Sequence, residues 1–152
     1  MELDARDRAI LRALQANARL TNVELADRVG LSPSACLRRV RLLEEAGLVA
    51  GYAMLLDPNV VGIPGNAFVQ ITLDQQGRPA LERFEKAIVD IPEVLSCYLT
   101  AGQGDYLLHV VYRNSTDLER LHTDTLTRLP GVLRVQSTLT LRTVKRTTAL
   151  PV

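Results

Sequence analysis

The segment TNVELADRVGLSPS carries the signals that end one helix and begin the next within a few residues. Thr21 and Glu24 form the T-x-x-E pattern of a capping box, in which each side chain bonds a backbone N–H of the first turn. Gly30 ends that helix. Ser32 is a good N-cap for the next helix, and Pro33 suits its first position because the N–H that proline lacks has no helical partner there. Two short helices joined by a tight turn containing glycine are typical of a helix-turn-helix.

One more helix is expected before this segment. Asp4 can cap a helix that runs to about Ala16, because apolar residues recur there at helical spacing and share one face. The helix that starts at Pro33 is expected to end at Ala46, before a glycine that can adopt the left-handed conformation. Residues 1–50 are therefore predicted to form a three-helix domain with a helix-turn-helix.

The helix after Pro33 is predicted to have a buried face and a basic outward face. At about 100° per residue, Cys36, Val40 and Leu43 cluster on one side, with Leu37 at their flank. The opposite side carries Ser34, Arg38, Arg41 and Glu45. Arg39 lies between the two sides, near a neighbouring helix or a phosphate. Surface arginines are common, so a plain solvated face is the alternative interpretation.

The second helix of a helix-turn-helix can lie in the major groove of double-stranded DNA. The capping box, the turn and the basic third helix together favour this function over a solvated face. Arg38 and Arg41 are expected to approach base edges or phosphates, and Arg39 a flanking phosphate. The residues predicted to contact DNA are Ser32, Ser34, Arg38, Arg39 and Arg41.

The remaining chain predicts a linker and a second, mixed domain. Residues 51–66 are expected to form a connecting strand and a linker rich in Gly and Pro, and residues 67–152 the second domain. Strands are expected at 67–73, 94–100, 105–112 and 132–141, and helices at 79–89 and 116–129.

The two halves of the second domain resemble each other in letters as well as in pattern. Leu81-Glu82-Arg83 corresponds to Leu118-Glu119-Arg120, and IPEVL corresponds to LPGVL. Two β-α-β units give a ferredoxin-like βαββαβ domain, with an antiparallel sheet and both helices on one face. The fold class is therefore α+β. The open face of the sheet predicts pairing with another copy of the chain, and candidates to line it are Tyr98, His109, Val111, Gln136 and Thr138.

Composition limits the other possibilities. The 152 residues are 47% hydrophobic and 23% charged, with a net charge of +1, as in an ordinary soluble protein. No apolar run approaches the ~20 residues of a membrane span, and the first residues do not form a secretory signal, so a cytoplasmic protein without a membrane partner is expected. Cys36 and Cys97 lack metal-like spacing, and we expect free thiols, no metal and no cofactor.

Over nearly its whole length the chain resembles the Lrp/AsnC, or feast/famine, family of transcription regulators. The resemblance is carried by LDARDRAILRALQANARLTNVELADRVGLSPSACLRRVRLLEEAGLV, GYAMLLDP, PEVLSCYLTAGQGDYLLHV and LPGVLRVQSTLTLRTVK, in this order. It implies a winged or plain helix-turn-helix domain that binds DNA. It also implies a ferredoxin-like domain that forms dimers and assembles them into tetramers or octamers. A small effector, usually an amino acid, is expected to bind between dimers.

The family resemblance places the effector site at the loop between the second and third strands, here Gly102-Gln103-Gly104-Asp105-Tyr106. Glycines let backbone N–H groups approach a carboxylate, and an aspartate can accept a bond from an ammonium group. A tight hairpin that needs Gly and Asp is an equally good interpretation. The residues expected to bind the effector are Gly102, Gly104 and Asp105, with Gln136 and Thr138 contributing from a neighbouring subunit.

Two other functions share this architecture. Some proteins of the same layout resemble siroheme decarboxylases, which use histidines against a tetrapyrrole. Here His109 and His122 lie without paired carboxylates or a nucleophile and base, and the arginines of the third helix are present, so we expect no enzyme and no catalytic residue. The other alternative is an amino-acid-sensing module that does not bind DNA.

Overall fold

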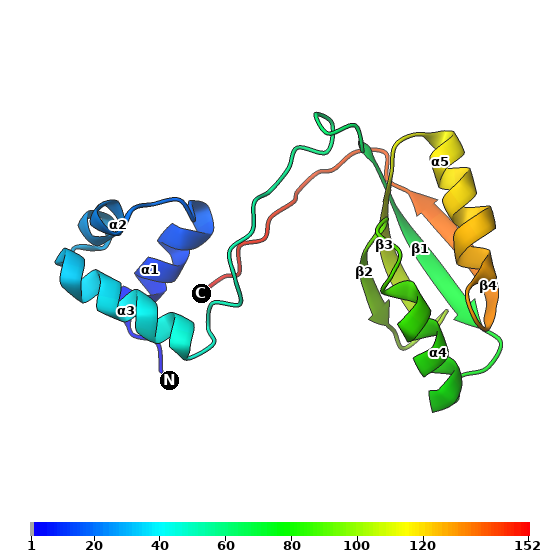
Figure 1. Ribbon diagram of the computed structural model, residues 1–152, viewed down its shortest axis with the longest axis horizontal. Helices are drawn as coiled ribbons and strands as arrows, with labels where there is room; N and C mark the ends of the chain where they lie inside the picture. The colour runs from blue at the N-terminus through cyan, green and yellow to red at the C-terminus, as the bar shows by residue number, and fades with distance from the viewer. Residues whose placement is uncertain (1) are drawn as a thin grey trace. The chain divides into compact units, whose positions relative to one another are not determined.

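The computed structural model describes residues 2–152, and these divide into two compact units (Figure 1). One unit contains the chain up to Leu55 together with Val144–Val152, and the other contains Leu56–Thr143. The first is helical and the second is built on an antiparallel sheet. The expected α+β class is confirmed.

Three capped helices form the first unit: α1 (Ala5–Ala16), α2 (Asn22–Val29) and α3 (Pro33–Glu45). The predicted N-caps are confirmed, since Asp4, Thr21 and Ser32 each accept a bond from the backbone N–H of the third residue of their helix. Gly30 ends α2 with φ +66°, in the left-handed region. The helices pack around a common core of Ile10, Ala13, Leu25, Ala26, Val29, Cys36 and Leu43.

The segment Val144–Val152 belongs to the helical unit, whereas the sequence predicted it as the end of the second domain. The side-chain amide of Gln15 holds it by two bonds. Gln15 Oε1 accepts the N–H of Leu150 at 2.6 Å, and Gln15 Nε2 donates to the carbonyl of Leu150 at 3.0 Å. Arg12 donates to the carbonyl oxygen of Val152 at 2.9 Å. Side chains of α1 thus bind the backbone of a segment more than a hundred positions away, which local patterns cannot reveal.

The connecting strand expected at the start of residues 51–66, from Gly51 to Asp57, is wrong. In the part of the chain that the structure describes, residues 51–57 have no regular structure and residues 58–62 form a turn. The turn is closed by Val61 N–H to the Asp57 carbonyl and by Ile63 N–H to the Pro58 carbonyl. Strand pairing begins only at Gly65. A segment forms a β-strand only when a neighbouring strand pairs with its backbone groups, and among the described residues no strand pairs with residues 51–57.

The second unit contains an antiparallel sheet of the order β2-β3-β1-β4 within residues 2–152. Its strands are β1 (Gly65–Leu73), β2 (Val94–Leu99), β3 (Tyr106–Tyr112) and β4 (Val132–Leu139). The helix α4 (Arg78–Ile88) connects β1 to β2, and α5 (Ser115–Arg120) begins the connection from β3 to β4. This is the βαββαβ arrangement that the internal duplication predicts.

One face of the sheet packs against the helices and the other is open. Alternate residues of β1, from Ala67 to Leu73, are buried in the same core as Phe84 of α4 and Leu121 beyond α5. The ring of Phe84 lies 4.5 Å, centroid to centroid, from that of Tyr106 on β3. On the open face Phe68 stacks on His109, its cross-strand partner, at 5.1 Å. All the residues predicted for the open face lie on it, as the strand register shows: Tyr98, His109, Val111, Gln136 and Thr138.

The second helix of this unit is not the single α-helix expected at 116–129. The α-helix ends at Arg120, a π-helical turn covers Leu121–Thr125, and a 3-10 turn covers Leu126–Arg128. Leu121 and Leu126 are both 1% exposed. Residues five apart point in different directions in an α-helix, and the wider π turn brings both leucines onto the sheet.

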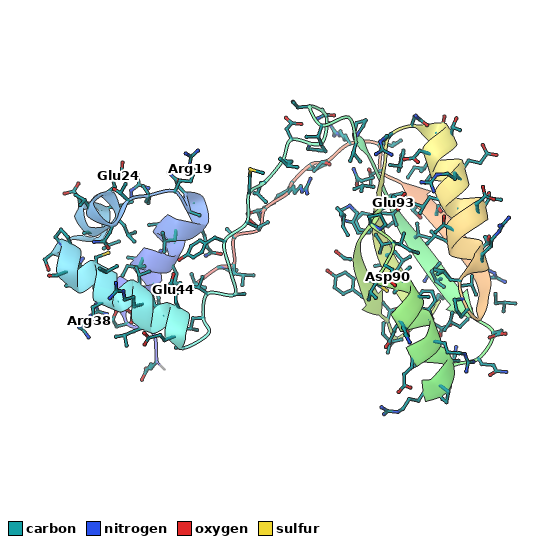
Figure 2. All side chains as sticks on the ribbon, viewed as in Figure 1. Arg19, Glu24, Arg38, Glu44, Asp90 and Glu93 are labelled. Carbon is teal, nitrogen blue, oxygen red and sulfur yellow. The ribbon has the colours of Figure 1, made fainter. Side chains whose placement is uncertain are left out.

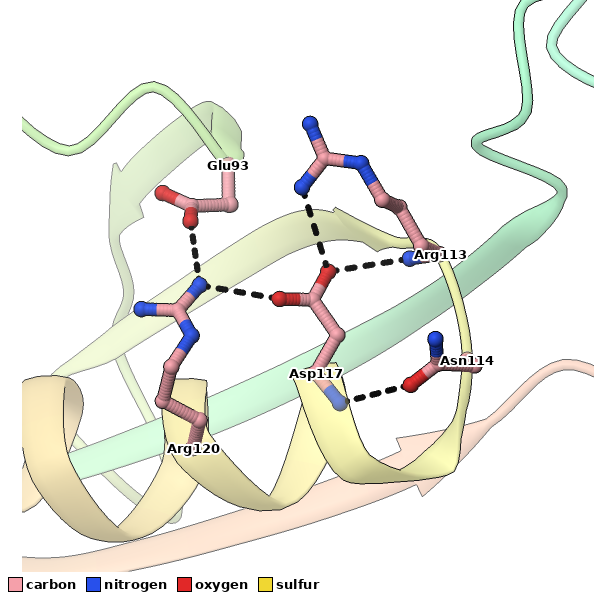
Figure 3. Close-up of polar contacts among 5 residues, drawn as sticks. All are labelled: Glu93, Arg113, Asn114, Asp117 and Arg120. Atoms are coloured by element: carbon pink, nitrogen blue, oxygen red, sulfur yellow. Dashed lines mark hydrogen bonds and ion pairs between the residues drawn. The ribbon is translucent and has the colours of Figure 1, made fainter.

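A charge network anchors the start of α5 (Figure 3). Asn114 caps the helix by accepting the N–H of Asp117 at 2.9 Å. Asp117 accepts from the backbone N–H of Arg113 and from Arg120, and these contacts, the backbone bond first, lower its pKa. Arg120 also contacts Glu93, just before β2, at 2.7 Å. The network joins the two β-α-β halves, because Asp117 and Arg120 belong to the second half and Glu93 to the first.

Candidate DNA-binding face and effector loop

The outward face of α3 is set by its buried side. Cys36 is fully buried and Leu43 is 1% exposed, which turns the opposite side of the helix to solvent. The side chains expected there, Ser34, Arg38, Arg41 and Glu45, are all exposed. Figure 2 shows Arg38 projecting from α3 away from the other helices of its unit. The face that the sequence predicts to be outward is therefore confirmed as outward.

A depression of about 280 Å³ lies along this face. Its lining consists of Ser34, Leu37, Arg38, Arg41, Leu42 and Glu45. Among the ion pairs of residues 2–152, none includes Arg38 or Arg41. Their positive charges are therefore available to a phosphate or to the acceptor atoms of a guanine.

Arg39 has a different place from its two neighbours. Its Nη1 lies 2.7 Å from a carboxylate oxygen of Asp4 and 2.7 Å from one of Asp7, and its side chain is only 26% exposed. The pKa of Asp4 is lowered, first by the backbone N–H of Asp7 and then by the bond from Arg39. Arg39 thus joins α3 to the start of α1. The phosphate contact predicted for it would have to compete with two carboxylates.

Two further contacts hold the turn between α2 and α3, and nothing in the sequence pattern indicated them. The amide of Asn22, at the start of α2, donates to the carbonyl of Pro33 at 2.8 Å. The guanidinium of Arg6 donates to the carbonyl of Val29 at the end of α2. Together with the cap at Ser32 they hold the turn and the start of α3, where Ser32 and Ser34 of the predicted DNA contact lie.

The loop between β2 and β3 requires its glycines. Gly102 has φ +135° and Gly104 has φ +82°, in the region that side-chain-bearing residues rarely adopt. A Cβ on Gly104 would also lie 2.6 Å from the side chain of Gln70 on β1. Gln70 is the cross-strand partner of Gln136 on β4. The structure thus brings Gly104 and Gln136, two predicted effector residues, to either side of Gln70, which the sequence analysis missed.

Asp105 is bound within its own chain. It is 8% exposed, and its two oxygens accept the N–H of Leu73 at 2.7 Å and the side-chain amide of Gln76 at 2.8 Å. Both partners lie at or beyond the end of β1, so the carboxylate connects that end to the loop. Its predicted bond to an ammonium group stays a prediction. Thr138 lies on the open face opposite Phe68, two residues further along β4 than Gln136.

No three His, Cys, Asp or Glu side chains of residues 2–152 lie together as a metal site would need. His122 Nδ1 lies 3.0 Å from the hydroxyl of Ser137, and His109 stacks on Phe68. No helix in the described range is long and apolar enough to cross a bilayer.

Comparison with known proteins identifies the family. Residues 66–150 match the Lrp/AsnC ligand binding domain, and residues 3–50 match a winged helix-turn-helix DNA-binding domain. The chain belongs to the Lrp/AsnC family. It is 40% identical over 149 residues to the leucine-responsive regulatory protein of Escherichia coli, an alignment that covers 98% of this chain and 91% of that protein.

Solved structures agree with this assignment over the whole chain. A transcriptional regulator of Neisseria meningitidis in complex with L-Met is 43% identical, with a TM-score of 0.95 and coverage of 99% of this Lrp/AsnC chain and 97% of the other. An AsnC family transcriptional regulator of Agrobacterium tumefaciens is 34% identical, with a TM-score of 0.93 and coverage of 98% and 97%.

The ion pairs of Arg39 predict a pH-dependent link between α1 and α3. In Arg39→Gln we expect the pKa of Asp4 to rise toward its ordinary value of 3.8, while the Asp7 N–H keeps it lower than that. A lowered pKa in the folded state stabilises the fold above the ordinary value, and this contribution is lost as the pH falls through the folded pKa. The gap in unfolding free energy between wild type and Arg39→Gln should therefore shrink in acid. NMR titration of the Asp4 carboxyl carbon measures its pKa in the wild type and in Arg39→Gln, with Arg19→Gln as the control. The same titration midpoint in Arg39→Gln as in Arg19→Gln would contradict the prediction.

The partners of Asp105 predict a structural effect of its removal. Asp105→Ala should lower the unfolding free energy by about 1–3 kcal/mol, because the buried N–H of Leu73 loses its acceptor. Asp105→Asn keeps an oxygen for that N–H and should lose less. Urea unfolding followed by circular dichroism measures both. Asp90→Ala, at an exposed carboxylate of the same unit, is the control, and equal stability of Asp105→Ala and Asp90→Ala would refute the effect.

Proposed function

We propose that this Lrp/AsnC protein is an amino-acid-responsive transcriptional regulator that binds double-stranded DNA through α3. The observation that carries the proposal is the outward row of Arg38 and Arg41, free of acidic partners within the described residues, on a helix whose first turn is held by two contacts. A rigid helix end is what base recognition needs, because the contacts must form in one geometry. The match of residues 3–50 to a DNA-binding family supports the same function.

Each residue of the predicted DNA contact takes a distinct role. Arg38 and Arg41 approach base edges or nearby phosphates. Ser32 and Ser34 lie at the positive end of the α3 dipole, with their hydroxyls 3.3 Å apart, and approach the sugar-phosphate backbone. Arg39 positions α3 through Asp4 and Asp7, and contacts a phosphate only if DNA displaces one of these carboxylates.

The effector in this proposal binds beside the loop between β2 and β3. The regulator of Neisseria meningitidis that resembles this chain forms a complex with L-Met, and the ligand-binding family matches residues 66–150. Gly102 and Gly104 leave backbone N–H groups accessible to a carboxylate, and Asp105 shapes the loop. Gln136 and Thr138 of a neighbouring subunit complete the site from its sheet face, and Gln70 lies between the loop and β4 of its own chain.

The open sheet face supports assembly into a homo-oligomer. Phe68 is 43% exposed, Tyr98 60% and Leu107 37%, and all three lie on this face. Contiguous apolar surface of this kind marks an interaction site. A dimer doubles the DNA contacts on a palindromic sequence, and further association gives the tetramer or octamer expected for the family. The family relationship favours a regulator over the siroheme-decarboxylase-like enzyme, and such a regulator acts where the DNA is, in the cytoplasm.

The arginine row predicts the salt dependence of DNA binding. A full-length Arg38→Ala/Arg41→Ala double variant should lose about 1–3 kcal/mol for each bidentate base contact removed, or its salt slope should become shallower by about one for each phosphate contact. Gel-shift titrations at several salt concentrations measure both quantities. Arg19→Ala, at an exposed arginine on another side of the helical unit (Figure 2), should leave both unchanged. Wild-type protein that binds no duplex at low salt would instead favour a sensing module without DNA.

The loop and Gln136 predict amino-acid binding. A thermal-shift screen of the twenty amino acids should find at least one that raises the melting temperature, since a ligand of the folded state stabilises it by RT ln(1 + [L]/Kd). L-Met is the first to test. Gln136→Ala should reduce the shift, whereas Gln75→Ala, at an exposed glutamine after β1, should keep it. A screen without any shift, or equal shifts in the two variants, would contradict the assigned site.

A further inference from the structure

We propose that Leu37 contacts the C5-methyl group of a thymine in the bound duplex, and so makes the DNA sequence preference depend on an apolar contact. This inference rests on the proposed function. The sequence placed Leu37 at the flank of the buried side of α3, but the structure leaves its side chain 39% exposed. Leu37 lines the depression on the outward face together with the two free arginines.

The position of Leu37 is set by the helical repeat. Ser34 lies three residues before it and Arg41 four residues after it, so the three side chains are neighbours on one surface. Scattered exposed leucines are normal on protein surfaces. Leu37 differs from these because it forms an apolar wall of a depression that also carries the predicted base-contacting cations.

The chemistry of the major groove supplies a matching group. Thymine is the base that presents a methyl group there, and it is recognised by apolar side chains. Arginine, by contrast, pairs with the O6 and N7 acceptors of guanine. A surface on which Leu37 adjoins Arg41 therefore fits a thymine next to a guanine, each contacted by the side chain of suitable chemistry.

Leu42 offers a matched comparison within the same depression. It is 42% exposed and also lines it, but it lies in the second half of α3, next to the carboxylate of Glu45. Base contacts of a recognition helix come mainly from residues nearer its N-terminus, and Leu42 comes after every residue of the predicted DNA contact. Leu37 is in the second turn after Pro33, within reach of the groove floor, whereas a carboxylate beside Leu42 repels the phosphates.

The test begins with a duplex selected from a randomised pool by the full-length wild-type protein. Each thymine of the selected duplex is then replaced by uracil, which lacks only the methyl group. For wild type we expect about a fourfold loss of affinity at one thymine of each half-site, the value of one buried methyl group. Leu37→Ala should bind the thymine and uracil duplexes equally well, while Leu42→Ala should keep the wild-type difference.

A second variant tests the same contact in the opposite direction. In Leu37→Gln the side chain stays helix-compatible and gains an amide that pairs with N6 and N7 of adenine. A renewed selection should then replace the thymine by adenine at that position. Circular dichroism establishes that both variants fold.

The outcomes separate this inference from the function on which it rests. Wild-type protein that selects no duplex would remove the proposed function itself. Three results together would overturn the thymine contact and leave the regulator in place. The wild type binds its selected duplex, Leu37→Ala keeps the wild-type ratio of affinities for the thymine and uracil duplexes, and selection with Leu37→Gln is unchanged.

Discussion

The buried side of α3, together with the contact of Arg39 with Asp4 and Asp7, determines how the proposed DNA-binding face is presented. Arg39 lies between the buried and exposed sides of α3, so binding it to α1 fixes the rotation of the helix about its axis. Ion pairs as exposed as that with Asp4 contribute little stability, typically below about 1 kcal/mol. Their value here is orientation, because they hold α3 in the rotation at which its buried side already turns Arg38 and Arg41 outward.

The sheet unit places its loop by similar means. Asp105 connects the loop to the end of β1, and the bare backbone of Gly104 lets the side chain of Gln70 lie against it. A glycine that is required by both its φ and its neighbour leaves the loop few other conformations. The shape of the loop is therefore held by contacts within its own chain, and the open face of the sheet carries Gln136 and Thr138 on β4, on the far side of β1. For the effector site we propose, a loop held in this way loses less entropy when it binds.

Features that depend on neighbours in sequence could be predicted, and features that depend on distant partners could not. The caps at Asp4, Thr21 and Ser32 involve bonds three residues apart, and all three were predictable. The order of strands followed from the duplicated pattern. The partners of Arg39 and Asp105 lie about thirty positions away, and the docking of Val144–Val152 on Gln15 spans 135. The π turn after α5 brings Leu121 and Leu126 onto the same sheet, and the local pattern does not reveal this contact. The sequence therefore predicted regular helix there.

A chain with a net charge of only +1 cannot rely on a long-range field to find DNA. At physiological salt, charges are screened beyond about 8 Å, so only cations that reach the duplex contribute. This chain separates its charges locally. Asp4 and Asp7 balance the charge of Arg39, while Arg38 and Arg41 form no ion pair with a described residue. In the function we propose, two cations in each copy give modest affinity, so tight binding depends on the proposed pairing through the open sheet face. With so few charged contacts, discrimination between sequences depends on short-range complementarity, including the apolar part of the α3 surface.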